Sequence, residues 1–296
     1  MAKLRRYVDL LSVALSILLL TGCRGTDTAS TRRLAESGNA KAQYDLGNRY
    51  AFGNGVQQDY AQAAIWFRKA AEQGSPDARL ELGLFYSYGY GVPQDYREAA
   101  IWFRMSADQG NARAQAALGH LYETGLGVSQ NYAVAADLYR KAAEQGYAPA
   151  QSALAMLFEA GRGVNQDYAE AADLYRNAAE QGNADAQTRL GVFYENGKGG
   201  VPKDYQEAAD WYRRAAEQGD TEGQVMLGLL YELGRGFPQD EVEAHFWYVL
   251  AASGPEGRGQ VLGEMSRDRT AKKLTPAELS EAQERAEKWL TEHPRK

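Results

Sequence analysis

The chain has 296 residues and carries 33 Lys and Arg against 39 Asp and Glu, a formal net charge of −6. This acidic balance argues against a nucleic-acid-binding surface, which needs basic side chains to neutralise phosphates. A mean hydropathy of −0.55 with 44% hydrophobic residues is typical of a soluble folded chain, and a single cysteine excludes an internal disulfide framework.

The first 22 residues have the organisation of a secretory signal peptide. Lys3, Arg5 and Arg6 make a short basic segment, and the run from Leu10 to Leu20 is apolar except for two serines. This run is too short to span a bilayer, which takes about 20 residues, whereas a basic start before a short apolar core is typical of a signal peptide. We therefore predict a signal peptide at residues 1–22 and a small, polar, flexible tether at residues 23–30.

Cys23 is the only cysteine of the chain and follows this segment directly. The sequence Leu20-Thr21-Gly22-Cys23 resembles a bacterial lipobox, in which cleavage before the cysteine leaves it as the lipidated first residue. The alternative is an ordinary signal peptide with an incidental cysteine. The resemblance implies a lipoprotein anchored through Cys23 in the envelope of a Gram-negative bacterium. An Asp after the cysteine commonly retains lipoproteins in the inner membrane, so Arg24 favours the outer membrane, facing the periplasm.

Cleavage before Cys23 also changes the charge of the chain. It removes three positive residues and one negative residue, so the formal net charge of the mature chain becomes −8.

A unit of about 36 residues repeats six times between Asn39 and Gly254. The units end at Gly74, Gly110, Gly146, Gly182, Gly219 and Gly254. In the second unit, Ser75-Pro76 begins one helix, and Gly89 and Gly91 end it. Asp95 begins a second helix. Two helices in each unit, stacked on the next unit, predict an all-α solenoid.

The evenly spaced aspartates are predicted to cap these second helices. They are Asp59, Asp95, Asp167, Asp204 and Asp240, and each is followed three residues later by Gln or Glu. This spacing is that of a capping box, and only the third unit departs from it, with Asn131 and Val134. Calcium loops or acid–base pairs are the alternative, but capping accounts for every occurrence.

The units resemble the Sel-1-like repeat, a relative of the tetratricopeptide repeat. The third unit carries the pattern in Ala114, Leu118, Gly119, Tyr122, Gly125, Gly127, Val128, Ala135, Leu138, Ala142, Ala143 and Gly146. The resemblance covers Asn39–Gly254 and implies a right-handed superhelical solenoid of helix–turn–helix repeats, which we place at residues 31–254. Such a solenoid works through its extended surface, so a protein partner is expected before a substrate.

Partial units are expected to cover both ends of the solenoid. The segment Leu34–Gly38 has the sequence pattern that ends a second helix. Thr275-Pro276-Ala277-Glu278 begins an amphipathic helix with Leu279, Ala282, Ala286 and Trp289 on one side. Residues 255–296 are therefore predicted to form C-terminal capping helices and a tail.

The sequence offers little for catalysis. His120, His245 and His293 have no metal-ligand spacing, and no phosphate-binding loop, dinucleotide fingerprint or nucleophile elbow occurs. Trp66, Trp102, Trp211 and Trp247 share a position that other units fill with Leu, which favours core packing. We predict no catalytic residue, no metal and no cofactor. The enzymatic alternative is a peptidoglycan or β-lactam hydrolase, since such activity is attributed to cysteine-rich Sel-1-like proteins, but the repeats here lack cysteine.

A partner groove is predicted on the first helix of each unit. With the cap as position 1 and 100° per residue, positions 6, 10 and 13 point away from the apolar face, and in tetratricopeptide-like solenoids that side is concave. The predicted contact residues are Tyr44, Asn48, Leu80, Leu84, His120, Glu123, Met156, Glu159, Val192, Glu195, Leu229 and Glu232.

The four glutamates at position 13 lie near helix C-termini, where negative charge is unfavourable. Either they bond to a neighbouring loop, or they form an acidic edge that favours a basic or polar segment of a partner. The resulting hypothesis is a lipid-anchored scaffold or adaptor that binds a protein partner in the cell envelope. A surface factor that binds a host protein is the alternative within the binding class.

Overall fold

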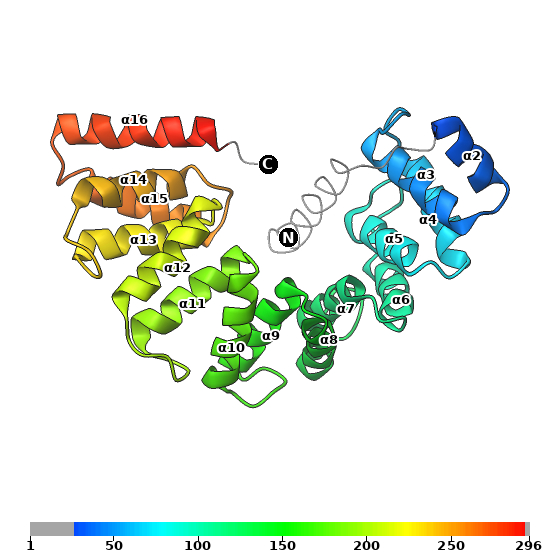
Figure 1. Cartoon of the computed structure of the whole chain (residues 1–296), viewed down its shortest axis with the longest axis horizontal. Coiled ribbons are helices and arrows are strands. Elements are labelled where there is room, and N and C mark those ends of the chain that lie inside the picture. The colour runs from blue at the N-terminus through cyan, green and yellow to red at the C-terminus, as the bar shows by residue number, and fades with distance from the viewer. Residues whose placement is uncertain (1–26, 294–296) are drawn as a thin grey trace. The chain divides into compact units, whose positions relative to one another are not determined.

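The computed structural model describes residues 27–293, and every regular element in that range is an α-helix. Contacts divide the described residues into two compact units. The N-terminal unit comprises residues 27–150 and 161–165, and the C-terminal unit comprises residues 151–160 and 166–293. In each, consecutive helices pack in antiparallel pairs (Figure 1). The predicted all-α repeat solenoid is therefore confirmed.

The helices follow the boundaries expected from the repeat. The N-terminal unit contains α2 (Thr28–Glu36), α3 (Ala40–Phe52), α4 (Tyr60–Glu72), α5 (Pro76–Tyr88), α6 (Tyr96–Ala107), α7 (Ala112–Thr124) and α8 (Tyr132–Glu144). The helix α9 (Ala148–Ala160) begins in the N-terminal unit and lies mostly in the C-terminal unit. The C-terminal unit continues with α10 (Tyr168–Glu180), α11 (Ala184–Asn196), α12 (Tyr205–Glu217), α13 (Thr221–Leu233), α14 (Glu241–Ala252), α15 (Arg258–Thr270) and α16 (Pro276–Glu292).

The predicted aspartate caps are confirmed, but the second half of the capping box is not formed at these helices. The Asp95 side chain accepts from the backbone N–H of Arg97 and Glu98, as an N-cap should. The N–H of Asp95 itself donates to the carbonyl of Tyr86 at 2.9 Å. Because that donor is already used, the Glu98 side chain does not bond back to it. The full reciprocal box forms at α16, between Thr275 and Glu278.

In five of the six repeats the helix pair is held by an aromatic ring placed against a glycine, and in the fourth repeat Ala155 takes the place of the glycine. In the second repeat, a Cβ added to Gly83 of α5 would lie 2.5 Å from the Phe103 ring of α6, so only glycine permits this approach. The corresponding aromatic residues, Phe67, Phe103, Tyr139, Tyr175, Tyr212 and Tyr248, are all at most 2% exposed. The interior of each pair is completed by alanines and leucines, which cost little side-chain entropy on burial.

Adjacent repeats meet where a loop crosses the start of the previous second helix. Gly127 has φ +71°, and an added Cβ would lie 2.3 Å from the carbonyl carbon of Tyr96. The residue beside this glycine also covers the tyrosine that begins the previous second helix. Arg162 lies over Tyr132, Lys198 over Tyr168 and Arg235 over Tyr205, as cation–π pairs, and Tyr90 stacks on Tyr60.

In four of the six repeats a glutamine pair ties the end of the second helix to the first helix, and in the second repeat Arg79 replaces one glutamine. Gln187 donates to the carbonyl of Ala179 and accepts from Gln218 at 2.7 Å. The same Gln–Gln bond joins Gln73 to Gln43, Gln145 to Gln115, and Gln181 to Gln151. In the sixth repeat, Ser253 stands where the second glutamine would be, and Oε1 of Gln224 is buried without a hydrogen-bond partner among residues 27–293.

Both ends of the described chain are capped, in partial agreement with the sequence. The helix α2 covers α3, as expected, but it begins at Thr28, so the last residues of the predicted tether are helical. The reason is a side-chain contact: Arg49 of α3 donates to the Thr28 hydroxyl at 2.9 Å. The predicted signal peptide and Cys23 lie outside the described residues.

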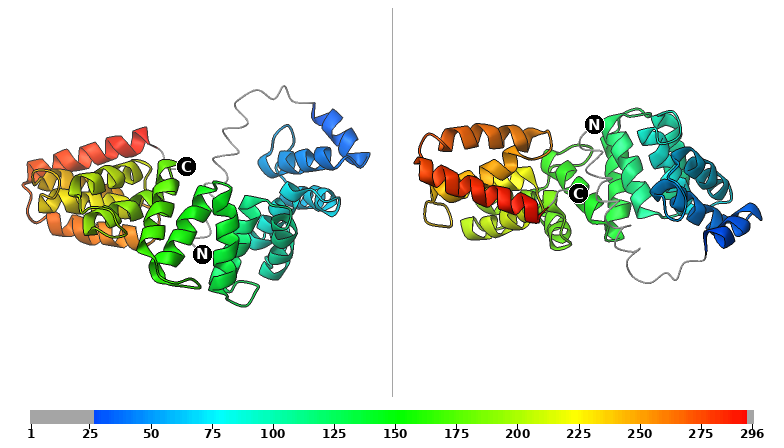
Figure 2. Two further views of the ribbon diagram at one scale, coloured as in Figure 1. Left: turned by 60° about the horizontal axis from the view of Figure 1, so that its bottom comes forward. Right: turned by 90° about the horizontal axis from the view of Figure 1, so that it is seen from above.

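The C-terminal cap consists of α15 and α16. Figures 1 and 2 show α16 lying along α14, and the two helices are in direct contact. Over the part of the chain described here, no helix combines the length and the apolar character needed to cross a membrane.

Candidate functional site

The four glutamates of the predicted acidic edge each accept a hydrogen bond from a buried tyrosine of the same repeat. Tyr139 donates to Glu123 at 2.7 Å, Tyr175 to Glu159 at 2.9 Å, Tyr212 to Glu195 at 2.9 Å, and Tyr248 to Glu232 at 2.9 Å. Burial raises the pKa of the Tyr175, Tyr212 and Tyr248 phenols, and the neighbouring carboxylates raise it further. These tyrosines are therefore neutral donors, and the glutamates have a structural partner.

In two of these Tyr–Glu pairs, the glutamate also contacts a cationic side chain from a later segment of the chain. Arg235, in the loop of the sixth repeat, lies 3.2 Å from Glu195. Glu232 accepts from Arg269 at 2.5 Å and from Lys273 at 2.9 Å. Burial raises the pKa of Glu232, but the hydrogen bonds from Arg269, Lys273 and Tyr248 outweigh it and hold that pKa below its ordinary value. Of the two sequence-based readings, the geometry favours bonding within the repeat array over a free acidic edge.

The expectation that position 6 of the first helices faces solvent is wrong in most repeats. Leu80 is 1% exposed, and Ala116, Ser152, Thr188 and Val225 are at most 8% exposed. The start of the next first helix covers this position: Ser152 donates to Asp185 at 3.0 Å, and Thr188 donates to Asp220 at 3.0 Å.

The other predicted contact residues differ in exposure. Leu84, His120 and Glu232 are also buried, at 7–9% exposed, so together with Leu80 they offer little surface to a partner. Tyr44, Asn48, Glu123, Met156, Glu159, Val192, Glu195 and Leu229 remain partly exposed.

Positions 3 and 14 of the first helices are at least partly exposed in every repeat, and so is position 7 except in the fourth, where Ala153 is buried. These positions form the exposed stripe, which is rotated by roughly 70° from the predicted one. Helix periodicity identifies the apolar side of each first helix, but it does not show which of the two adjoining sides is covered by the next repeat. The stripe predicted from the sequence lies on the covered side. Position 10 lies between the two stripes. In the C-terminal unit it holds Met156, Val192 and Leu229, which are all apolar and partly exposed. Leu233 lies at position 14 of α13, four residues after Leu229, and is 48% exposed.

The N-terminal unit presents polar residues on the same stripe. Arg113 of α7 lies 3.7 Å from Glu81 of α5. Burial raises the pKa of Glu81, and Arg113 only partly offsets this. Burial and the Glu81 charge together raise the pKa of Tyr44 to about 12. A weakly compensated carboxylate and a neutral phenol can accept and donate hydrogen bonds, but the residues do not form a catalytic set.

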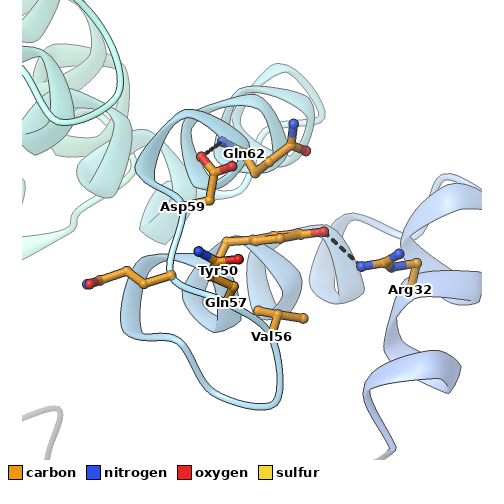
Figure 3. Close-up of a pocket in the computed structure, with 7 residues that line it drawn as sticks. Arg32, Tyr50, Val56, Gln57, Asp59 and Gln62 are labelled. Atoms are coloured by element: carbon orange, nitrogen blue, oxygen red, sulfur yellow. Dashed lines mark hydrogen bonds between the residues drawn. The ribbon is translucent and has the colours of Figure 1, made fainter.

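A shallow cavity of 470 Å³ lies at the start of the first repeat, between α2 and the loop before α4 (Figure 3). Arg32 of α2 donates to the Tyr50 hydroxyl at 2.8 Å, and Asp59 accepts from the backbone of Gln62 at 3.0 Å. Gln58 donates to the carbonyl of Ala51. These hydrogen bonds engage the polar side chains around the cavity, which forms the junction between the N-terminal cap and the first repeat.

No group of three or more His, Cys, Asp or Glu side chains within residues 27–293 could hold a metal ion. His245 is 1% exposed, and its Nδ1 lies 2.7 Å from the Thr270 hydroxyl. Burial, followed by the nearby Arg267, lowers the pKa of His245. His245 therefore joins α14 to α15.

The repeat sequence matches the Sel1 repeat in six consecutive segments. They are residues 40–75, 76–111, 112–147, 148–183, 184–220 and 221–255. This chain belongs to the Sel1 repeat family. Sel1 repeat proteins generally mediate protein–protein interactions and are typically non-enzymatic scaffolds. The family assignment agrees with the packing roles of the capping aspartates, the tyrosine-bound glutamates and the glycines between helices.

Solved Sel1 repeat structures resemble this one. The crystal structure of a Sel1 repeat protein from Oxalobacter formigenes is similar with 30% sequence identity and a TM-score of 0.70, over 79% of this chain and 100% of that chain. A protective antigen present in uropathogenic Escherichia coli strains is 28% identical, with a TM-score of 0.40, over 89% of this chain and 86% of that chain. Comparison with curated proteins found no match.

Proposed function

We propose that this Sel1 repeat protein is an envelope scaffold that binds a protein partner on the first helices of its C-terminal unit. The observation that carries this proposal is the row formed by Met156, Val192 and Leu229. These residues occupy one position in three consecutive first helices, and all three are apolar and partly exposed. A polar stripe lies beside this apolar row on the same helices. The surface therefore suits a partner segment that carries both apolar and polar side chains.

The chemistry of the partner segment follows from what the repeat array leaves unused. The four glutamates are engaged by tyrosines, so they no longer favour a basic segment. The charged groups on the same helices are Arg189, Glu222 and Asp185, of which Asp185 also accepts from Ser152, so both signs are present. We therefore expect a partner whose apolar side chains contact the row and whose flanking polar groups are of both signs.

Photo-crosslinking in cells tests this surface. A photoreactive residue at Met156 and another at Leu229 should each capture the same protein, because both face the same bound segment. The control is Asp137, which is exposed on α8, a second helix. Capture of the same protein from Asp137, or of unrelated proteins from the two test positions, would contradict the proposal. The double variant Met156→Asp and Leu229→Asp should lose the crosslinked protein while keeping its helical circular dichroism signal.

We further propose that Cys23 carries the lipid that holds the protein in the outer membrane, facing the periplasm. The lipobox resemblance at Leu20–Cys23 supports this assignment, and Arg24 supports the choice of membrane. Growth with an alkyne-tagged fatty acid should label the protein, and Cys23→Ser should abolish the label. Membrane fractionation and protease shaving of intact cells then establish the membrane and the side that it faces. Labelling that survives Cys23→Ser would rule the anchor out.

A further inference from the structure

The C-terminal helix shows how this protein binds an amphipathic helix on the outer side of a second helix. Ala282 and Ala286 of α16 are fully buried against α14, where Phe246 is 6% exposed and Leu250 is fully buried. Arg285 lies between the two alanines. Its guanidinium is 4.7 Å from the Phe246 ring centre and 2.5 Å from Glu243. The small side chains let the helix approach closely, and the ion pair fixes its direction.

An indole completes the polar part of this contact. Nε1 of Trp247 donates to Glu243 at 2.9 Å, so Glu243 joins Trp247 of α14 to Arg285 of α16. A carboxylate that is shared between a neutral donor and a guanidinium is held in one rotamer, and its hydrogen bonds are charge-assisted.

The same positions of α6 carry the same kinds of residue, and two of them are exposed. Counted from the capping aspartate, Glu98, Ile101, Trp102 and Met105 correspond to Glu243, Phe246, Trp247 and Leu250. Ile101 is 51% exposed and Met105 is 36% exposed. Nε1 of Trp102 is buried without a hydrogen-bond partner among the described residues. We call Glu98, Ile101, Trp102 and Met105 the α6 outer face.

At the position of Ile101, apolar residues are confined to the first two repeats and the covered sixth repeat. The position of Ile101 holds Ile65 in α4, which is 47% exposed. In the third to fifth repeats it holds Asp137, Asp173 and Asp210 instead, and each aspartate pairs with an arginine three residues later. Exposed ion pairs of this kind suit a solvated surface, whereas neighbouring exposed isoleucines mark a contact surface.

We propose that the α6 outer face binds an amphipathic helix of a partner protein in the way that α14 binds α16. The bound helix would present two small residues four apart, with an arginine between them. The arginine would pair with Glu98, and Glu98 would accept from Trp102 Nε1. This surface lies on second helices, so the proposal stands independently of the first-helix row at Met156, Val192 and Leu229.

The α16 sequence itself supplies the probe. A labelled peptide of residues 275–293 is added to the full mature chain, which carries a photoreactive residue at Ile101 or, as the matched control, at Asp137 of α8. A single helix buries a small interface, so we expect a dissociation constant of about 100 μM to 1 mM. The peptide should crosslink at Ile101 and not at Asp137. A peptide that displaced the chain's own α16 from α14 would not crosslink at Ile101.

Charge reversal separates this geometry from simple hydrophobic adhesion. Arg285→Glu in the peptide should reduce crosslinking at Ile101 by about tenfold, the loss expected for one charge-assisted pair. Glu98→Arg in the protein should restore it for the reversed peptide and weaken it for the original. Ile101→Asp with the photoreactive residue moved to Met105 should abolish capture of both peptides.

Three results would overturn the proposal. The first is equal crosslinking at Ile101 and Asp137, and the second is a reversed peptide that Glu98→Arg does not rescue. The third is self-association: a dimer that dissociates on Ile101→Asp while the peptide fails to crosslink would show that the α6 outer face binds a second copy of this chain instead.

Discussion

The hydroxyl of Tyr248 donates to the carboxylate of Glu232 across 2.9 Å, inside the sixth repeat. The same pair occurs in repeats three to five, whereas the first two repeats replace both partners together: Phe67 comes with Ala51, and Phe103 comes with Ser87. The paired change shows that the phenol and the carboxylate are one structural device. A carboxylate in this place is acceptable when a tyrosine donates to it, and it is absent where a phenylalanine stands opposite.

Tyr175→Phe is therefore expected to destabilise the protein by about 2 kcal/mol, because it removes a hydrogen bond to a charged group and leaves Glu159 without that donor. Urea unfolding followed by circular dichroism measures the change. The double variant Tyr175→Phe and Glu159→Ala reproduces the arrangement of the first repeat. It should be about 1 kcal/mol more stable than Tyr175→Phe alone, since both polar partners leave together. Strictly additive single effects would contradict the coupling.

Charge reversal of Glu159 and Glu195 together is expected to lower the melting temperature. Each lysine would meet the hydroxyl of a buried tyrosine, Tyr175 or Tyr212, and the second would also face Arg235. If these glutamates formed a free acidic edge for a partner, the variant would instead keep its stability and lose only partner binding. Thermal unfolding of the isolated protein decides between the two. As a control, reversal of Asp137, an exposed residue on α8, should leave the melting temperature nearly unchanged.

Ser253→Gln is expected to stabilise the sixth repeat by about 1 kcal/mol. The new amide would donate to Oε1 of Gln224, as Gln218 donates to Gln187 in the fifth repeat. Ser253 is exposed at the end of α14, so the longer side chain has room. Ser253→Ala is the matched control, because it removes the hydroxyl without supplying a donor. If Ser253→Gln were no more stable than the wild type, the new amide would not supply the hydrogen bond that Oε1 of Gln224 lacks.

Gly127→Ala should cost about 2 kcal/mol more than Gly110→Ala. Both glycines have positive φ, +71° and +87°, so the backbone strain is similar in the two variants. An added Cβ at Gly110 meets nothing within 4 Å, whereas at Gly127 it strikes the carbonyl of Tyr96. The difference in unfolding free energy therefore measures the contact between two repeats. Equal losses in the two variants would show that this contact relaxes without cost.

His245 should make stability fall as the pH drops below about 6.5, its ordinary pKa. Burial and Arg267 lower the folded pKa of His245, while Asp268 opposes them. The unfolded chain therefore binds the proton first, and folding is penalised between the ordinary and the folded pKa. Urea unfolding of wild type and His245→Asn at pH 7 and pH 5 tests this. The wild type should lose more stability than the variant over that interval, and parallel losses would exclude His245 as the cause.

Glu232 should act in a more acidic range. Its folded pKa is depressed, so its contribution is complete above the ordinary pKa of 4.5 and disappears as the pH falls through the folded value. Glu232→Gln should remove the corresponding part of the acid-induced loss, measured as unfolding free energy between pH 5 and pH 3. A variant with the acid sensitivity of the wild type would show that Arg269 and Lys273 act through other groups.

The fold was predictable because single residues at recurring positions determine where each helix begins, where it ends and how it packs. Asp95 caps a helix, Gly89 ends one and Gly83 admits an aromatic ring. The same residue types recur at this spacing with two exceptions, Asn131 in the third unit and Ala155 in the fourth. The capping boxes were over-predicted because a sequence shows the acceptor, Glu98, but not that Tyr86 already takes the N–H of Asp95.

The binding surface was harder to predict. Helix periodicity placed position 6 opposite the core, but Thr188 is covered because the next first helix begins beside it. The Tyr–Glu pairs left a signal in the sequence: Glu at position 13 occurs only in the four repeats with Tyr in the second helix, at Tyr139, Tyr175, Tyr212 and Tyr248. Comparing the repeats with one another would have found it. The α6 outer face needed coordinates, because only the contact of Arg285 with Glu243 shows what such a face can bind.

Each Tyr–Glu pair lies within one repeat, and each loop residue meets a tyrosine that every preceding repeat supplies. A gene rearrangement that deletes or duplicates one whole repeat among the third to fifth therefore recreates the same contacts at the new junction, whereas the sixth repeat has Glu241 in place of that tyrosine and carries the C-terminal cap. A crossover inside a repeat would instead place a glutamate opposite a phenylalanine, as if Glu123 faced Phe103. The number of repeats in this protein can thus change during evolution without compensating substitutions, provided that the exchange respects the boundaries at the glycines.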